Sequence, residues 1–342
     1  MQEHVLSSEA ECARGLFRDV DVLNHAISGS DLEIIQLEPG DLEAHALNFD
    51  VGRLSVDCGS TNRKLRVRGS LDAGRYSVGV FQPGARAMLN GASVDPSALL
   101  CYAPGAEMDG HLQEGYGWTS LVIPADWVES ISLAARDPGV LTSIAGCKHM
   151  RPGPARLQDL RVAIDALIVS RFQREPSEDG ADPLPLDVRN ALGAVLSDFD
   201  TPNSELDCRS LSHYRMARRA ESRMRERVSE NLCIDDICTE LRVSRRYLEY
   251  AFVDAFGTSP SRYFRVLRLH QVRRRLRKPG VATTVTSEAL NHGFNHLSLF
   301  STQYRALFGE SPSSTLSSSM NSSLFVRNID SGPIAACSKI SN

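Results

Sequence analysis

The chain has 342 residues, 42% of them hydrophobic, and a formal net charge of −4, which is sufficient for two domains with ordinary apolar cores. It contains no apolar run long enough to span a membrane, and residues 1–10 lack the basic-then-apolar order of a signal peptide, so we expect a cytoplasmic protein without membrane contact. Its eight cysteines are scattered without a CxxC pair, which favours reduced thiols over disulfides or a zinc site.

Charge is distributed unevenly along the chain. Residues 209–309 carry 19 Arg and Lys against 9 Asp and Glu, a balance of +10, whereas the rest of the chain carries 19 against 33, a balance of −14. This segregation indicates a polyanionic partner for the C-terminal part alone.

The N-terminal part reads as β-structure. Apolar and polar residues alternate with a period of two in residues 32–37, 54–56, 65–67, 76–80 and 121–123. Pro-Gly and Asn-Gly turns separate these runs, so we predict a β-rich region over residues 30–123 that forms an antiparallel barrel or sandwich. The pattern is compatible both with a ligand cavity inside the barrel and with a solid side-chain core.

After residue 124 the period changes to that of helices, which we expect over residues 125–136, 155–173 and 184–199. Leu157, Leu160, Ile164, Leu167 and Ile168 form an apolar stripe at helical spacing. This stripe packs either on the barrel, which is the simpler interpretation, or across a homodimer interface. Residues 201–209 have the composition of a linker, and the Ser-rich residues 317–342 that of a disordered tail.

An internal repeat marks the basic region. Residues 256–260 and 308–312 match at an offset of 52, and Leu248 and Phe252 fall on Phe300 and Tyr304 at the same offset. Each copy therefore predicts an amphipathic helix that ends at a glycine, Gly257 or Gly309, because glycine readily adopts the left-handed C-cap conformation.

A shorter helix precedes each of these two helices. In the first copy residues 234–241 form it, Arg242 and Val243 form a turn, and Ser244 caps the next helix. In the second copy residues 286–291, the turn around Gly293, and Asn295 play the same parts. Two helices joined by such a tight turn are a helix-turn-helix unit, whose second helix enters the DNA major groove.

A third helix, predicted from Pro260 to about Arg277, connects the two units. Its apolar residues change side along its length, so that each end packs against one unit. Such a connector fixes the separation of the two reading helices, and we expect them to reach successive major-groove faces of one duplex, about 34 Å apart.

These residues resemble the DNA-binding domain of the AraC/XylS family of regulators. The resemblance covers residues 210–316, and its most specific stretches are residues 241–248, 268–276, 293–297 and 308–312. It implies an α+β protein with a cupin-like N-terminal barrel over residues 1–200 and a C-terminal all-α domain of two helix-turn-helix units joined by a long helix. It also implies transcription activation, with RNA polymerase as a possible partner.

Within the family the domain is most similar to regulators of ethanolamine utilisation. The shared residues are 243–246, 283–285, 293–294, 296–297 and 312–313. We do not carry over the effector or cofactor of those proteins, because the first 200 residues show no effector-binding motif.

Nine residues are expected to contact DNA. If Leu248 faces the core, the first reading helix turns four side chains outward, namely Arg245, Arg246, Glu249 and Tyr250. Arg246 is suited to guanine and Glu249 to cytosine, although a solvated surface arginine remains the alternative for Arg246. The second helix presents His296, Ser298, Ser301, Thr302 and Arg305. Since hydroxyls bond several base edges, we predict a relaxed base preference there.

Two arginine-rich clusters, residues 218–227 and 273–278, are candidates for phosphate contacts. Some of the first cluster must instead pair with Glu221, Glu226 and Glu230, which lie three or four residues away on the same helix.

Catalytic motifs and metal-ligand spacings are not found. His25, His45, His111 and His149 are isolated, and no nucleotide-binding or hydrolase motif occurs, so we predict no enzyme activity, no metal and no cofactor. The sequence indicates a specific DNA-binding regulator whose N-terminal domain binds a small-molecule effector or forms a homodimer. A non-specific architectural DNA-binding protein, and a metal-dependent cupin enzyme fused to a DNA-binding module, are the alternatives.

Overall fold

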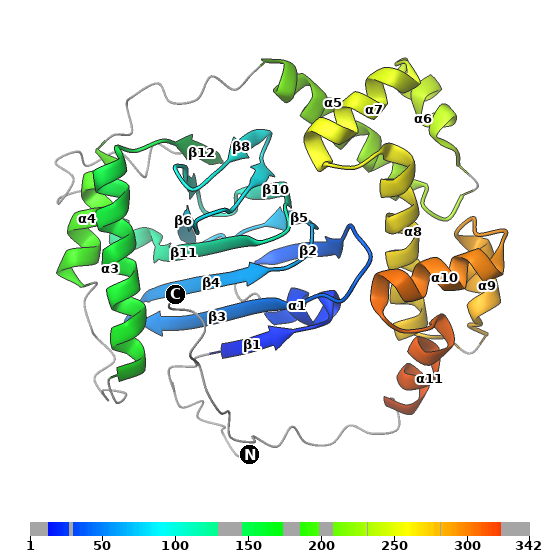
Figure 1. Ribbon diagram of the computed structural model, residues 1–342, viewed down its shortest axis with the longest axis horizontal. Helices are drawn as coiled ribbons and strands as arrows, with labels where there is room; N and C mark the ends of the chain where they lie inside the picture. Colours follow the sequence, from blue (N-terminus) through cyan, green and yellow to red (C-terminus); the bar gives the residue numbers. More distant parts are fainter. Residues whose placement is uncertain are drawn as a thin grey trace, which may run out of the picture.

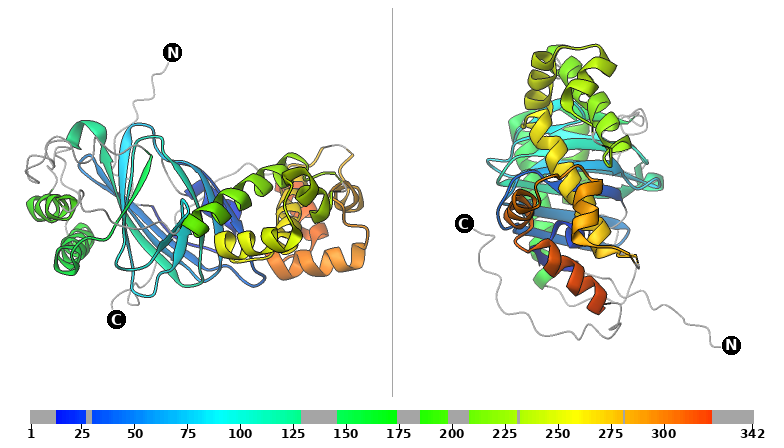
Figure 2. Two further views of the ribbon diagram at one scale, coloured as in Figure 1. Left: turned by 90° about the horizontal axis from the view of Figure 1, so that it is seen from above. Right: turned by 90° about the vertical axis from the view of Figure 1, so that its right-hand side faces the viewer.

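The computed structural model describes residues 13–26, 30–128, 146–173, 185–197, 208–230, 232–280 and 282–322. It has the predicted α+β class, with a β-barrel in the middle, a pair of helices on one side and an all-helical domain on the other (Figures 1 and 2). In the described residues, no helix is both long and apolar enough to cross a membrane.

Seven antiparallel strands form the larger sheet, in the spatial order β1-β3-β4-β11-β6-β9-β12. Their bounds are β1 Ala13–Phe17, β3 Ala44–Val51, β4 Leu54–Thr61, β6 Arg75–Phe81, β9 Leu99–Tyr102, β11 Tyr116–Pro124 and β12 Cys147–Met150. Because side chains alternate across a strand, one face of this sheet meets the helix pair and the other faces the barrel interior.

Five antiparallel strands form the smaller sheet, in the order β2-β5-β10-β7-β8. Their bounds are β2 Asp31–Gln36, β5 Leu65–Ser70, β7 Ala87–Leu89, β8 Ala92–Val94 and β10 Glu107–Leu112. Helix α1, Val20–Ala26, packs beside β2 and contributes Val20 and Leu23 to the interior. The antiparallel β-architecture predicted from period-two alternation, a barrel or sandwich, is confirmed as two facing antiparallel sheets, which together we call the barrel.

Helices α3, Pro154–Gln173, and α4, Leu186–Leu196, cover the outer face of the larger sheet (Figure 1). Leu157, Leu160, Ile164 and Leu167 are buried against that face, so packing on the barrel is the correct interpretation of the apolar stripe. Of the helix expected over residues 125–136, the structure has only the 3-10 turn η1, Ala125–Trp127, and the first helical residue, Val128. Residues 129–136 lie outside the described part.

The C-terminal domain contains seven helices in the described residues. Their bounds are α5 Cys208–Glu226, α6 Ile234–Leu241, α7 Arg245–Phe256, α8 Pro260–Arg277, α9 Val285–Asn291, α10 Leu297–Phe308 and α11 Pro312–Ser322. Helix α8 is the predicted connector between the two lobes (Figure 1). Its six predicted apolar residues are all buried, namely Tyr263, Val266, Leu267, Leu269, Val272 and Leu276.

Two boundaries differ from expectation. Helix α5 begins at Cys208, inside the expected linker. The expectation of disorder from residue 317 is wrong as far as Ser322, because α11 continues to that residue and Tyr304 bonds Thr315 at its start, with 2.9 Å between the hydroxyl oxygens. A tertiary contact thus orders a serine-rich segment whose own sequence has little helical periodicity. Residues 323–342 lie outside the described part.

The smaller sheet is a wall shared by the two domains. Ile34, Val67 and Leu112 face the barrel interior, whereas the alternate positions Ile35, Arg66 and His111 face the helical domain. Ile35 belongs to the same apolar core as the helices of that domain. Each domain therefore contacts one side of the same three strands, β2, β5 and β10.

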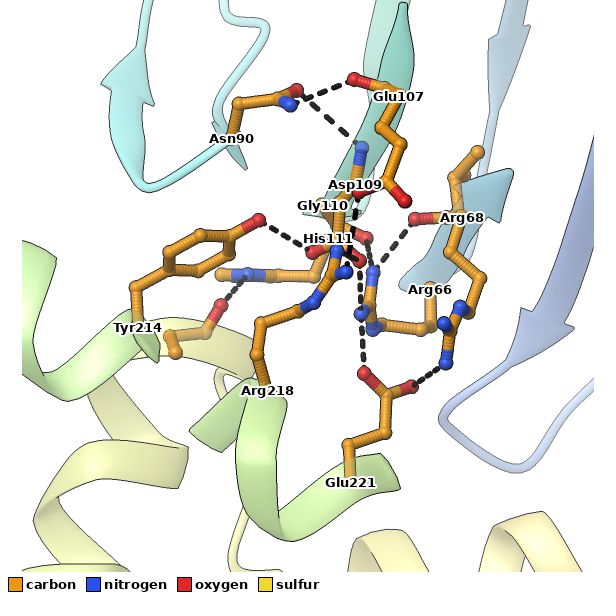
Figure 3. A network of polar contacts seen from close by, with 12 residues as sticks. Arg66, Arg68, Asn90, Glu107, Asp109, Gly110, His111, Tyr214, Arg218 and Glu221 are labelled. Atoms are coloured by element: carbon orange, nitrogen blue, oxygen red, sulfur yellow. Dashed lines mark hydrogen bonds and ion pairs between the residues drawn. The ribbon is translucent and has the colours of Figure 1, made fainter. Parts of the chain in front are cut away.

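A buried network of ion pairs joins this wall to α5 (Figure 3). The Arg66 guanidinium is fully buried and donates to Asp109 at 2.8 Å and to Glu221 at 2.6 Å. Burial alone would raise the pKa of Glu221, but the positive charges of Arg66 and Arg225 and a hydrogen bond from Tyr263 outweigh it and hold the pKa at about 2. The carboxylate is therefore charged at neutral pH.

A second ion cluster lies at the far end of α8. Arg273 is buried and bonds Asp19 at 2.7 Å and Glu310 at 3.0 Å, while Arg277 pairs with Asp19 and Asp21. Arg274 pairs with Glu33 of β2. Phosphate contact by these three arginines would therefore have to replace existing ion pairs, most of them with acidic residues of the N-terminal domain.

Acid is expected to weaken the contact between the domains. His111 Nδ1 donates to Ala255 O at 2.7 Å, and His270 Nε2 lies 3.1 Å from Gln36 O; burial lowers the pKa of His111 to about 4 and of His270 to about 3. Between pH 6.5 and these values the unfolded chain binds protons that the folded chain does not, so stability is lost as the pH falls. We expect a loss of about 2 kcal/mol per histidine between pH 7 and pH 5.

Urea unfolding at the two pH values measures this loss, and His111→Gln should reduce it. Asp57 contributes with the opposite sign, because burial raises its pKa to about 6. The difference in this pH-dependent loss between the wild type and His111→Gln gives the contribution of His111 alone. Equal pH dependence in the two proteins would contradict the expectation.

Candidate nucleic-acid interface

The first helix-turn-helix unit consists of α6, a tight turn and α7. Arg242 takes the left-handed conformation in the turn, with φ of 55°, and the Ser244 hydroxyl accepts a hydrogen bond from the Tyr247 backbone at 3.2 Å. Leu248, Phe252 and Phe256 are fully buried on the inner side of α7, as predicted. Gly257 ends the helix with φ of 65°.

The outer side of α7 carries the predicted reading residues. Arg245, Arg246 and Tyr250 are exposed, whereas Glu249 is half-buried. The Arg246 guanidinium lies over the Tyr250 ring and donates to its hydroxyl at 3.2 Å, so the ring holds it along the helix surface. Arg245 pairs with Asp235 of α6 at 3.0 Å, an exposed ion pair that a phosphate or base could replace at little cost.

The second unit is α9, a turn and α10. The Thr284 hydroxyl caps α9, whose first residue is Val285, one earlier than predicted, and Gly293 has φ of 77° in the turn. The prediction that Asn295 caps the reading helix is wrong. Helix α10 begins at Leu297, so His296 is the N-cap residue, and it makes no side-chain capping hydrogen bond.

The reading side of α10 is also exposed. His296, Ser298, Ser301, Thr302 and Arg305 are all accessible to solvent. The Thr302 hydroxyl donates to Ser298 O at 3.0 Å, within the helix itself. In this conformation the hydroxyl hydrogen of Thr302 is engaged by its own helix, and the relaxed base preference of this unit stays a prediction.

The two units should respond differently to loss of the expected cap. We expect Ser244→Ala to lower the free energy of unfolding by about 1 kcal/mol, because it removes the hydroxyl that accepts the Tyr247 N–H. Asn295→Ala should change it by less than about 0.5 kcal/mol, since this residue lies before the cap. Urea titrations of both variants measure the difference. Equal losses of unfolding free energy in the two variants would indicate that Asn295 does cap α10.

A substitution on α10 tests the predicted relaxed base preference. Thr302→Arg should create a base preference beneath the second unit, because arginine reaches guanine O6 and N7 where threonine bonds its own helix. Affinities for a panel of DNA sites that differ only under this helix measure the change. An unchanged preference would count against Thr302 as a groove-facing position.

The barrel leaves both reading surfaces open. It contacts α7 through the Ala255 carbonyl and α10 through the Ala306 carbonyl, which accepts from the Gly40 backbone at 2.9 Å. The predicted reading residues remain exposed, or half-buried in the case of Glu249, with the barrel in place. The two helices with exposed outer sides, α7 and α10, pack toward opposite ends of α8 (Figure 1).

The predicted pairing at three and four residue spacing is confirmed, within α5 for Glu221 and Glu226 and just after its end for Glu230. Glu221, Glu226 and Glu230 pair with arginines three or four residues away, namely Arg225 at 3.1 Å, Arg223 at 2.8 Å and Arg227 at 2.6 Å. Arg218 pairs with Asp109 of the barrel. Phosphate contact by these side chains would have to replace an existing ion pair.

Sequence reasoning missed the barrel residues that hold the reading domain, above all Arg66, Asp109 and Asp19. Arg66 sits at an outward position of an alternating strand, where a solvated arginine is the ordinary expectation, so the sequence carries no signal for its burial. Among the described residues, no cluster of three or more His, Cys, Asp or Glu side chains could hold a metal ion.

A helix-turn-helix domain family matches residues 237–318. The XylDLEGF operon transcriptional activator 2 of Pseudomonas putida is 37% identical over 93 residues, which cover 27% of this chain and 59% of that protein. The probable thc operon regulatory protein of Rhodococcus erythropolis is 33% identical over 86 residues, 25% of this chain and 26% of that protein. Two further XylDLEGF operon activators of P. putida are matched over 29% and 28% of their length, so this chain spans under a third of those relatives.

Two solved structures are similar to this chain, with low TM-scores. That of the AraC-like transcriptional activator CuxR has a TM-score of 0.39 and 18% identity, covering 77% of this chain and 96% of that one. An AraC-type transcriptional regulator from Chromobacterium violaceum has a TM-score of 0.29 and 32% identity, covering 31% of this chain and 92% of that one.

Proposed function

We propose that this protein, whose C-terminal domain is an AraC/XylS-type helix-turn-helix domain, is a sequence-specific transcription regulator controlled from its barrel. The observation that carries the proposal is the pair of exposed reading surfaces, on α7 and α10, at the two ends of one rigid helix. A helix of this kind places its N-terminal side chains at base edges in the major groove.

In this proposal the nine predicted contact residues make different contacts with DNA. Arg246 reads guanine, Glu249 accepts from cytosine, and Arg245 and Tyr250 contact phosphate or thymine. The residues of α10 add affinity with little base preference. Transcription activation, contact with RNA polymerase, homodimer formation and a location in the cytoplasm belong to the proposal as well, and the closer likeness to ethanolamine-utilisation regulators stays a prediction.

The shared wall supports control by the barrel. A molecule in the barrel interior would touch Ile34, Val67 and Leu112, while the reverse face of the same strands holds α5 and α7 through Arg66 and His111. A ligand that favours one arrangement of these strands would therefore shift how the reading domain is held.

Selection of bound DNA from a random-sequence pool tests the proposal. We expect a single enriched site, and competition with unrelated DNA should leave its complex largely intact. An architectural DNA-binding protein would instead yield no enriched sequence and would be displaced equally by any DNA. That outcome would overturn the assignment as a specific regulator.

A further inference from the structure

The barrel interior contains a cavity of about 400 Å³, between the two sheets. This volume lies in the range of small-molecule sites in proteins. Most of its wall is apolar and includes Leu23, Ile34, Phe81, Leu100, Tyr116 and Trp118. The sequence left open whether this interior is filled by side chains, and the structure has space there for an apolar body.

One end of the cavity is polar. Strand alternation turns Asn48, Ser55, Asp57, Ser77 and Ser120 of β3, β4, β6 and β11 toward the interior. Hydroxyls and carboxylates at one end, opposite an apolar wall, are suited to a ligand with a polar head and a hydrocarbon body.

The charges at this end have one dominant sign. Among the described residues that line the cavity, Asp50, Asp57 and Asp72 are acidic and Arg75 is the one cation. Arg75 is already engaged, because it donates to the Ser55 hydroxyl at 2.5 Å and lies 3.9 Å from Asp72. Ser55 in turn donates to Asp50 at 2.5 Å. The polar end therefore attracts a cation more strongly than an anion.

Asp57 is the carboxylate that lacks a partner. In the described part of the chain it makes no hydrogen bond or ion pair, and burial raises its pKa to about 6. An unpaired carboxylate in such a place is costly, and a cation or hydrogen-bond donor bound beside it would offset that cost.

We propose that the barrel cavity binds a small molecule with an apolar body and a protonated amine, and that the Asp57 carboxylate receives the ammonium group. Ser77 and Ser120 lie on the neighbouring strands β6 and β11 and accept the remaining N–H groups, while the apolar wall around Phe81 and Trp118 encloses the hydrocarbon part. The regulatory meaning of this site rests on the proposed function, whereas the binding itself does not.

Calorimetric titration of the full-length protein with two matched probes tests the site. Phenethylamine carries the amine, and 3-phenylpropionate carries a carboxylate on a body of nearly the same size. We expect the amine to bind at least about tenfold more tightly than the acid, and quenching of tryptophan fluorescence to accompany binding because Trp118 lines the cavity. Equal or tighter binding of the acid, or no binding of the amine, would overturn the proposal.

Three variants locate the contact. Asp57→Asn keeps the shape of the side chain and should weaken amine binding about tenfold or more. Gly79→Val keeps Asp57 but fills part of the cavity, which Gly79 lines. A Cβ at this position meets its nearest neighbours at 3.7 Å or more, without a clash, so we expect weaker binding of both probes. Asp126→Asn, an exposed carboxylate paired with Arg53, serves as the matched control and should change nothing.

These titrations contain no DNA, so they separate the two proposals. Unchanged amine affinity in folded Asp57→Asn protein would overturn the ligand class while leaving the regulator assignment intact. Failure to select a DNA site would overturn the regulator assignment while leaving a measured amine affinity intact.

Discussion

Replacing Arg246 with alanine is expected to weaken binding of the specific DNA site by about 5- to 150-fold, which corresponds to the roughly 1–3 kcal/mol of one good bidentate contact to a base. Arg246 is exposed near the start of α7, the part of a reading helix that meets base edges, and Tyr250 supports its guanidinium at 3.2 Å. Because the contact reads one base pair, its loss should also relax the preference at that position alone.

Binding curves for the selected site and for its single-base variants measure both effects. Arg53→Ala is the matched control, since Arg53 is an exposed arginine of the barrel, paired with Asp126 and far in sequence from α7. It should leave DNA affinity within about twofold. A uniform loss across all base variants would instead assign Arg246 to a phosphate, and no loss would remove it from the interface.

The reading domain was predictable because its signals are local. The repeat of Leu248 and Phe252 at Phe300 and Tyr304 fixed the buried sides of α7 and α10, and the glycine at each helix end marked the stops. These patterns depend on helix geometry within a dozen residues, which sequence alone contains. The two errors of this kind, the cap at Asn295 and the start of α9, are each a shift by one residue, because helix boundaries are the least defined part of a helix.

The contact between the domains was not predictable, because it depends on residues far apart in the chain. Arg66 and Glu221 are separated by 155 positions, and Arg277 and Asp19 by 258. An arginine-rich helix such as α8 has the same composition whether its charges meet phosphates or carboxylates. The charge balance of the basic region therefore overstated what is available for DNA, since acidic residues of the barrel neutralise part of it.

The cavity was predictable only in part. Alternation predicted which residues of β4 and β6 point inward, but not whether their side chains would fill the interior. That outcome depends on barrel diameter and on how the two sheets pack, neither of which a single strand encodes. The acidic end is visible only once Asp50, Asp57 and Asp72 are brought together from three separate segments of the chain.

Removal of Arg66 is expected to have the largest effect on stability. Arg66→Ala removes the fully buried cation 2.8 Å from Asp109 and 2.6 Å from Glu221. Asp109 keeps Arg218 and Glu221 keeps Arg225, so we expect a loss at the lower end of the about 3–5 kcal/mol that breaking a buried ion pair costs. Because Asp109 belongs to the barrel and Glu221 to α5, the loss falls on the contact between the domains (Figure 3). The two domains should then unfold separately instead of together.

Urea titration followed by two signals detects that separation. Both tryptophans, Trp118 and Trp127, lie in the barrel region, so their fluorescence reports the barrel, whereas far-ultraviolet circular dichroism is dominated by helices, most of which lie in the C-terminal domain. We expect the two curves to coincide in the wild type and to separate in Arg66→Ala, with the helical transition at lower urea. Glu221→Gln, which keeps the side-chain shape, should show a smaller shift of the same kind.

The exposed pair of Arg53 and Asp126 is the control for the effect of burial on the Arg66 network. Its N–O distance of 2.6 Å equals that of Arg66 and Glu221, so the two pairs differ chiefly in burial. Arg53→Ala should therefore cost less than about 1 kcal/mol, because solvent screens an exposed pair. If Arg66→Ala costs no more than Arg53→Ala, and its two curves still coincide, the apolar contacts around Ile35 hold the domains together and the ion network does not.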